Sequence, residues 1–115
     1  MEHSLTLAFD NSELVTNPYF RGLVIKPPTF DLPALRKDVR TIARRAWIDR
    51  TRSEYIGVMV ARRLWALLVD VNAPADVQEL GLKMMLDEQR HTRLCMAAAQ
   101  ALGAEPEVVF DLSEL

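Results

Sequence analysis

The chain has 115 residues, of which half are hydrophobic and 26% are charged, and this composition is typical of one small globular domain rather than of a disordered chain. The formal net charge of −2 argues against a surface built for nucleic acid or membrane, and no apolar run approaches the roughly 18 residues of a membrane span. The single Cys95 excludes an internal disulfide, and the start Met1-Glu2-His3 does not resemble a secretory signal. We therefore expect a cytoplasmic protein.

Residues 1–30 show no helical periodicity and contain three prolines, Pro18, Pro27 and Pro28. We expect an irregular or extended leader here, with short strands at most around Leu5–Ala8 and Leu23–Ile25. We also predict that this leader packs across a neighbouring subunit.

Residues 31–104 carry the signals of two helices. Asp31 is a suitable N-cap and Pro33 fits a first turn, so the first helix is expected near 33–71, with a bend around 49–53. Asn72 is expected to cap a second helix that ends at Gly103. The acidic tail, residues 105–115, is weakly specified. The sequence thus predicts an all-α fold, an antiparallel two-helix hairpin with an irregular N-terminal leader.

The two predicted helices each place ionisable residues on an apolar side. Val58, Ala61, Trp65 and Leu68 fall within about 40° of Glu54, and Arg45, Arg52, Arg63 and Asp70 lie opposite. Within about 40° of Glu88 lie Val77, Gly81, Met84, Cys95, Ala99 and Leu102, and His91 lies about 60° away. We expect no other polar residue on these stripes. Because glutamate is rarely buried unless it is paired or bound, these positions need an explanation.

Glu54 and Glu88 also match in height along the hairpin. Glu54 lies 19 residues before Ala73 and Glu88 lies 15 residues after it. In antiparallel helices the two residues would differ by only about 6 Å along the axis. The sequence therefore predicts that Glu54, Glu88 and His91 form one cluster.

The segment Glu88-Gln89-Arg90-His91 is a Glu-x-x-His motif, which projects a carboxylate and an imidazole from one helix face. This donor set suits Fe or Mn and tolerates Zn. A di-metal site in a bundle takes a Glu from each of two helices and a Glu-x-x-His from each of two others, and this chain supplies one of each.

The stretch Trp47–Gly103 resembles the N-terminal helix pair of ferritin-like di-iron proteins, which include ferritins, rubrerythrins and two-helix encapsulated ferritins. The interval of 34 residues from Glu54 to Glu88 is similar to the usual spacing between the first two helices of that superfamily. The resemblance implies half of a four-helix bundle with a di-iron or di-manganese site. It also implies that Glu54 bridges or terminally ligates a metal, that Glu88 bridges two metals and that His91 is a terminal ligand.

A second Glu and a second Glu-x-x-His are missing, so other copies or chains must complete the site. The leading hypothesis is a homodimer, or a multiple of dimers, that acts as a ferroxidase or as an oxidoreductase activating O₂ or peroxide, with a small molecule as the second possible substrate. One alternative is a non-catalytic helical oligomerisation or binding module, in which Glu54 pairs with Arg50 and the polar cluster fixes register. Another is a fragment or companion subunit of a longer ferritin-like enzyme.

The remaining candidates have simpler interpretations. Cys95, Tyr55 and Trp65 are expected in the core, as are Met84, Met85 and Met96. A basic run precedes the proposed site and indicates a solvated or subunit-contacting face, with an anionic partner as the alternative; its members are Arg36, Lys37, Arg40, Arg44, Arg45, Arg50 and Arg52.

Overall fold

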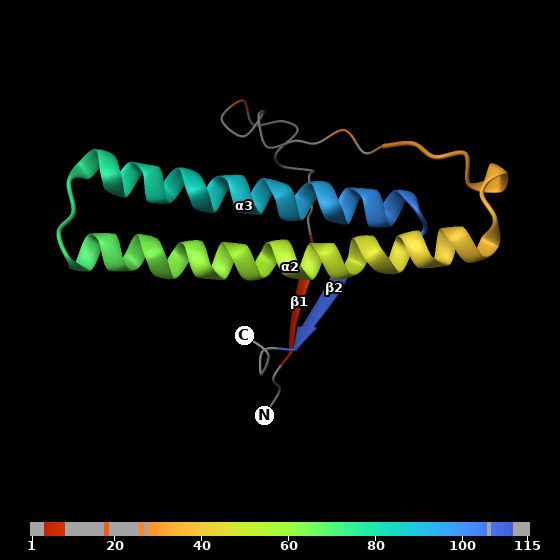
Figure 1. Ribbon diagram of the computed structural model, residues 1–115, viewed down its shortest axis with the longest axis horizontal. Coiled ribbons are helices and arrows are strands. Elements are labelled where there is room, and N and C mark those ends of the chain that lie inside the picture. The colour runs from red at the N-terminus through yellow and green to blue at the C-terminus, as the bar shows by residue number, and fades with distance from the viewer. Residues whose placement is uncertain (1–3, 9–17, 19–25, 27, 106, 112–115) are drawn as a thin grey trace.

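Two long helices dominate the computed structural model, which describes residues 4–8, 18, 26, 28–105 and 107–111. Helix α2 (Lys37–Asp70) and helix α3 (Ala75–Ala101) lie antiparallel along the length of the molecule (Figure 1). Strands β1 (Ser4–Ala8) and β2 (Glu107–Asp111) form a two-stranded antiparallel sheet. The predicted helical hairpin is therefore confirmed, whereas the strand expected at Leu23–Ile25 lies outside the described residues.

The first helix begins later than the sequence indicated. Pro33 sits in a single 3₁₀ turn, Leu32–Ala34, and the Asp31 side chain makes no capping hydrogen bond. Leu35 and Arg36 then take extended backbone, with ψ of 136° and 143°, so α2 starts at Lys37. Asp38 lies in the first turn of α2, where its negative charge interacts favourably with the positive end of the helix dipole. Its carboxylate also forms an ion pair with Arg36 at 2.6 Å.

The connection between the helices uses Asn72 differently from the prediction. Asn72 does not cap α3; it follows the end of α2 with a positive φ of 53°, a conformation that asparagine tolerates better than most residues. Pro74 occupies the N-cap position of α3. At the other end, Gly103 has φ of 97° and its N–H donates to the Gln100 carbonyl at 2.9 Å, so the predicted stop at this glycine is confirmed.

Small residues allow α2 and α3 to approach closely. Ala61 on α2 and Gly81 on α3 are buried, and a Cβ at Gly81 would lie only 3.0 Å from Leu68 Cδ1 and 3.4 Å from Trp65 Cδ1. Further along α3, the buried residues are Cys95, Ala98, Ala99 and Leu102. The apolar face predicted around Glu54 is therefore the face that packs against α3.

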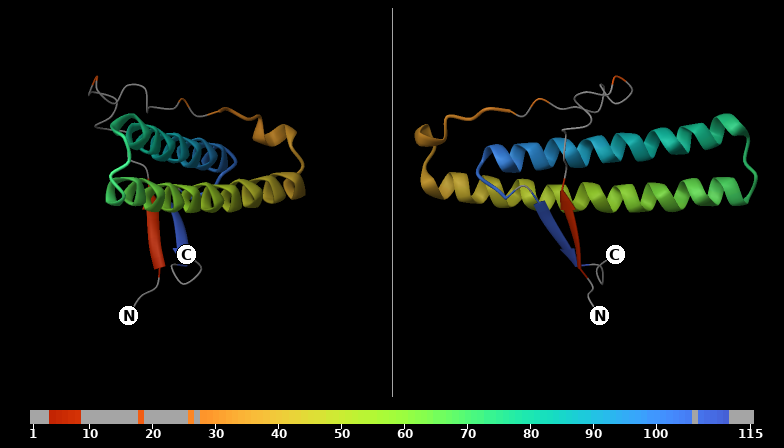
Figure 2. Two further views of the ribbon diagram at one scale, coloured as in Figure 1. Left: turned by 60° about the vertical axis from the view of Figure 1, so that its left-hand side comes forward. Right: turned by 180° about the vertical axis from the view of Figure 1, so that it is seen from behind.

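The acidic tail contains a strand that the sequence analysis did not predict. Leu5 pairs with Phe110 and Leu7 with Val108, and alternate residues of β2 are buried, as expected for a strand with one face on a core. Val108 and Phe110 form a small core with Met96, against which Ile48 and Tyr55 of α2 pack. The sheet lies against α2 and extends beyond it on the side away from α3 (Figures 1 and 2). Residues 4–8 of the leader thus pair within the chain, and the leader's predicted packing across a neighbouring subunit stays a prediction.

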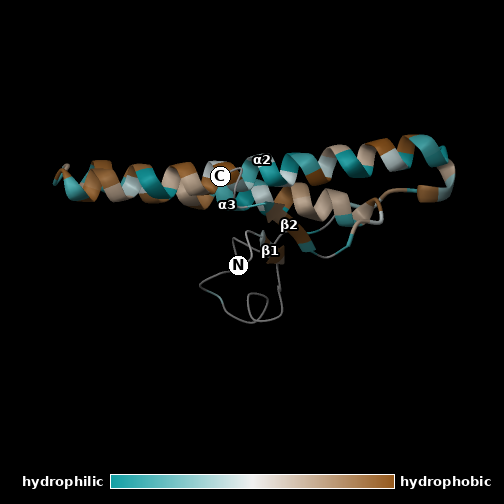
Figure 3. Cartoon of the chain, turned by 90° about the horizontal axis from the view of Figure 1, so that it is seen from below, coloured by the Kyte–Doolittle hydropathy of each residue, from teal (hydrophilic) through white to brown (hydrophobic). Residues whose placement is uncertain are grey.

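The hairpin leaves a row of large apolar side chains exposed on the faces turned away from the sheet. These positions lie about 120–180° around their helices from the sheet contacts Tyr55 and Met96. Figure 3 shows that hydrophobic and hydrophilic residues alternate along both helices. We call these exposed positions the open apolar face: Val60, Leu64, Leu67, Val71, Leu80, Met84 and Leu94, each 37–63% exposed. Met84 is therefore not the core residue that was expected, whereas Met96 is buried. Within the described residues, neither helix has the length and apolar character needed to cross a bilayer.

Candidate metal centre

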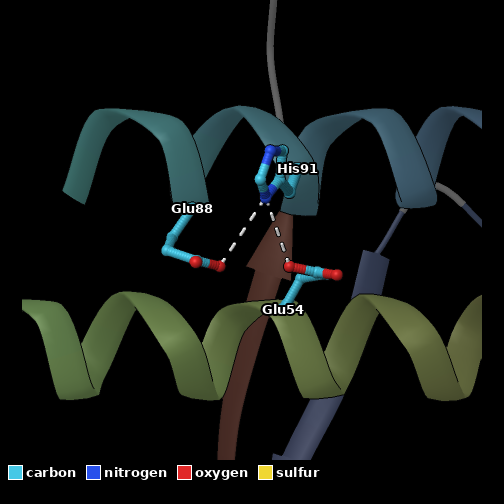
Figure 4. Close-up of side chains that lie close together, drawn as sticks. All are labelled: Glu54, Glu88 and His91. Carbon is cyan, nitrogen blue, oxygen red and sulfur yellow. Dashed lines mark ion pairs between the residues drawn. The ribbon is translucent and has the colours of Figure 1, made fainter. Parts of the chain in front are cut away.

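Glu54, Glu88 and His91 converge between the two helices (Figure 4). Glu54 comes from the middle of α2, and Glu88 and His91 lie one turn apart on α3. His91 Nδ1 is 3.5 Å from Glu54 Oε2 and 3.8 Å from Glu88 Oε2. The structure thus brings together the three residues that the sequence singled out, and their role as metal ligands stays a prediction.

The spacing of the three groups suits one shared cation. One ligand atom from each residue can be chosen so that all lie within 4.8 Å of one another. Oxygen and nitrogen ligands about 2.1 Å from a transition metal are at most about 4.2 Å apart, so small side-chain rotations would close the cluster around an ion. The contacts of His91 are longer than the roughly 2.7–3.2 Å of an ordinary N–H···O hydrogen bond. The imidazole is therefore close to both carboxylates without a short hydrogen bond to either.

The cluster opens toward the surface through its imidazole. The Glu54 side chain is 16% exposed, Glu88 is 33% exposed and His91 is 52% exposed. His91 lies about 140° around α3 from Met96, which places it in the same row as Leu80, Met84 and Leu94 of the open apolar face. The site is therefore at the edge of a surface that is itself uncovered.

Gly57 makes room for the Glu88 carboxylate. A Cβ built on Gly57 would lie 2.6 Å from Glu88 Oε2 and 3.1 Å from its Cδ, closer than atoms in contact can approach. Gly57, the only glycine of α2, therefore lies at the position where the Glu88 carboxylate of α3 approaches the backbone of α2 most closely among the atoms around it. The sequence offered a signal for this role, since Gly57 interrupts a long helix three residues after Glu54.

The two carboxylates differ in their surroundings and in their acidity. Burial acts to raise the pKa of Glu54, but the hydrogen bond from Arg50, a hydrogen bond with Glu88 and the charges of Arg50 and His91 outweigh it, so that this pKa is lowered. Burial raises the pKa of Glu88, and the neighbouring Glu54 raises it further. Glu54 thus holds its negative charge more readily, whereas none of the described arginines or lysines forms an ion pair with Glu88 as Arg50 does with Glu54. A metal ion would supply that missing positive charge.

Two buried threonines flank the site, contrary to the expectation that no other polar residue lies on the inner faces. Thr51 and Thr92 are fully buried. Each donates its hydroxyl hydrogen to a carbonyl one turn earlier, Thr51 to Trp47 at 2.8 Å and Thr92 to Glu88 at 2.9 Å. Because a threonine can satisfy its hydroxyl within its own helix, it fits an apolar interface that would reject other polar residues.

The other predicted core residues lie near the centre without joining the cluster. Cys95 is buried, and burial followed by the Glu54 charge raises the pKa of its thiol, so it remains an uncharged packing residue. The Tyr55 ring packs on Phe110, with ring centroids 4.9 Å apart. Trp65 is partly buried, and its Nε1 is shielded from water and has no hydrogen-bond acceptor in the part of the chain that the structure describes.

The fold and the cluster together define a helical hairpin that carries two carboxylates and an imidazole close together between its helices. Comparisons with protein-family models, with curated proteins and with solved structures gave no match. The function must therefore be argued from the site itself.

Proposed function

We propose that this chain forms half of a ferritin-like di-iron or di-manganese site and that a second copy completes it, giving a ferroxidase or an oxidoreductase that uses O₂ or peroxide. The observation that carries the proposal is the convergence of Glu54, Glu88 and His91 from two helices, within 4.8 Å of one another, at the edge of an exposed apolar face. Carboxylate oxygens with one imidazole are a donor set that suits iron and manganese.

The case for a second copy rests on the incomplete site and the uncovered surface. Three protein ligands leave an iron or manganese ion with several open positions. His91 and the open apolar face point the same way, so a partner seated on that face would also reach the site. A second copy related by a two-fold axis would bring the same apolar residues and a second set of ligands, which makes the surface self-complementary.

The residues of this chain would divide the work at such a site. Glu54 and His91 would hold one ion. Glu88, whose carboxylate lies beside Gly57 and 3.8 Å from His91, would be shared between two ions. Burial of the open apolar face on association would exclude water from the cluster and strengthen its electrostatic interactions. The bound ions would supply the redox chemistry.

Metal content and assembly mass, measured together, test the proposal. Metal-free protein would be loaded anaerobically with Mn(II) or Fe(II) and examined by native mass spectrometry. We expect one metal ion per chain in an even-numbered homo-oligomer, together with O₂ consumption when Fe(II) is present. Glu88→Gln should lose the metal and this activity, whereas the control Asp87→Asn should keep both, because Asp87 pairs with Lys83 at 2.8 Å. Metal binding and O₂ consumption that survive Glu88→Gln would contradict the proposal.

The Arg50–Glu54 ion pair supports a second candidate, a non-catalytic helical module in which the polar cluster sets the register of association. In that case Fe(II) and Mn(II) would leave the melting temperature unchanged, whereas a metal bound to the folded state must raise it. A companion subunit of a longer enzyme would behave differently again, because its full metal content would appear only after a different chain is added.

A further inference from the structure

A small basic pocket lies at the start of α2, away from the metal centre. Lys37, Arg40 and Arg44 recur at intervals of three and four residues and so share one face of the helix. Together with Thr41 and Leu102, which follows α3, they line a pocket of about 180 Å³. Three cationic residues of α2 therefore line a pocket beside the end of α3.

Within the described part of the chain, the lining of this pocket contains no acidic residue that could balance its positive charge. Two acids of the same helix are paired outside the pocket, Asp38 with Arg36 and Asp49 with Arg52. Among the residues that the structure describes, no ion pair involves the three cations of the pocket. Mutual repulsion of these side chains is thus left uncompensated.

Two further observations show that the Arg40 and Arg44 side chains lie against the protein. Arg40 Nε is shielded from water and finds no hydrogen-bond acceptor among the described residues, so part of this cation is desolvated without compensation from them. Arg44 Nη1 would lie 3.4 Å from a Cβ at Gly103, which places it beside the end of α3. Arg40 and Arg44 are therefore partly buried, whereas most surface arginines extend into solvent.

We propose that this pocket binds a phosphate group, either free phosphate or the terminal phosphate of a small molecule. Planar guanidinium groups match the oxygen geometry of phosphate, and three positive charges favour a doubly charged anion over a carboxylate. The Thr41 hydroxyl donates to the Lys37 carbonyl at 3.0 Å, so the cations alone carry the recognition. Arg44 precedes Glu54 by ten residues, about 15 Å along the helix, and the two sites share no residue.

A simpler role for the same cations is to stabilise the negative end of the α3 dipole. That role requires no bound anion, so it predicts no saturable phosphate binding. Calorimetric titration of the full chain separates the two roles. The protein would first be freed of metal with a chelator and kept in chloride buffer, so that phosphate bound to a metal ion cannot contribute.

We expect inorganic phosphate to bind saturably at one site per chain. Arg40→Gln and Arg44→Gln should each weaken binding about tenfold, because a hydrogen bond to a charged group is lost, and Arg63→Gln, an exposed arginine of α2 outside the pocket, should not. A parallel titration with glycerol phosphate identifies the source, since tighter binding would indicate the phosphate group of a small molecule. Absence of saturable binding by the unaltered protein, or an equal loss in Arg63→Gln, would overturn the proposal. Thermal unfolding without phosphate shows whether each variant is folded, and Lys37→Gln provides a third variant if an arginine variant is not.

Discussion

Arg50 Nε donates a hydrogen bond to Glu54 Oε1 at 3.0 Å, one helical turn away on α2, while the other oxygen of the same carboxylate faces His91 Nδ1 at 3.5 Å. Glu54 therefore has a cation of its own before any metal arrives. The guanidinium neutralises one of the two carboxylates of the cluster, and a metal ion at the site must share Glu54 with it.

Replacing Arg50 should strengthen metal binding. Arg50→Gln removes a positive charge that both competes for Glu54 and repels an incoming cation. We expect the Kd for Mn(II) to fall about fivefold, a modest change because the Arg50 side chain is 65% exposed. Lys83→Gln, which removes a similar one-turn ion pair with Asp87, is the control for the loss of a helix-surface charge. Weaker binding by Arg50→Gln would show instead that this arginine holds Glu54 in the conformation that binds metal.

Gly57→Ala should stabilise the fold and weaken the site. Alanine is favoured over glycine in a helix interior by about 1 kcal/mol, and the atom that obstructs the new methyl group is the mobile end of Glu88. The metal-free variant should therefore melt at a higher temperature, while the displaced carboxylate binds Mn(II) less tightly. Ser53→Ala, at an exposed position of the same helix, controls for helix propensity alone. Unchanged metal affinity in Gly57→Ala would mean that Glu88 does not need its observed position.

Glu88→Gln should make the metal-free protein more stable at neutral pH. The pKa of Glu88 is raised in the folded state by burial and by Glu54, so its protonated form is favoured by folding. The resulting stability is present at low pH and is lost as the pH rises through the folded-state pKa. Glutamine removes the cost of the charged form, and the melting temperature at pH 7 should rise by a few degrees. The difference should disappear below about pH 4, where a glutamate is protonated even in the unfolded chain; a constant difference at all pH values would contradict this origin.

A charge on the open apolar face should prevent association. Leu67 is 55% exposed in the middle of that face, and Leu67→Glu would bury a carboxylate at the proposed interface without a partner. Sedimentation of the metal-loaded protein should show an even-numbered oligomer for the unaltered chain and a monomer for Leu67→Glu. Gln100→Glu adds the same charge at an exposed position of α3 outside this face and should leave assembly unchanged. An oligomer that persists in Leu67→Glu would place the contact elsewhere.

The hairpin and the cluster could be predicted because both follow from periodicity. The apolar spacing around Glu54 and Glu88 indicates which helix faces meet, and their similar distances from the turn, 19 and 15 residues, place them about one helical turn apart in height. The role of Gly57 could not be derived in the same way, because a glycine within a helix does not reveal which side chain comes close to it. The burial of Thr51 and Thr92 was not predicted. Each hydroxyl is satisfied by a carbonyl of its own helix, so these polar residues are tolerated at an apolar interface.

The errors at the ends of the elements have a common origin in local backbone choices. Pro33 is compatible with the first turn of an α-helix, yet the extended backbone at Leu35 and Arg36 separates its short turn from α2. Asn72 can serve either as a cap or in a left-handed conformation, and only the geometry of the turn decides between them. The strand in the tail had a weak signal, the alternation of Val108 and Phe110, which becomes decisive only when Leu5 and Leu7 are available to pair with it.

The pairing of Leu5 with Phe110 joins segments from opposite ends of the described chain. Closing so long a loop is slow compared with forming a local helical hairpin, and two strands alone are rarely stable in water. The helices should therefore form first and provide the surface on which the strands meet, through Ile48, Tyr55 and Met96. In amide hydrogen exchange, the strand amides should therefore exchange faster than the amides in the centres of α2 and α3. Unfolding of this protein should begin with the separation of the two strands from the helices.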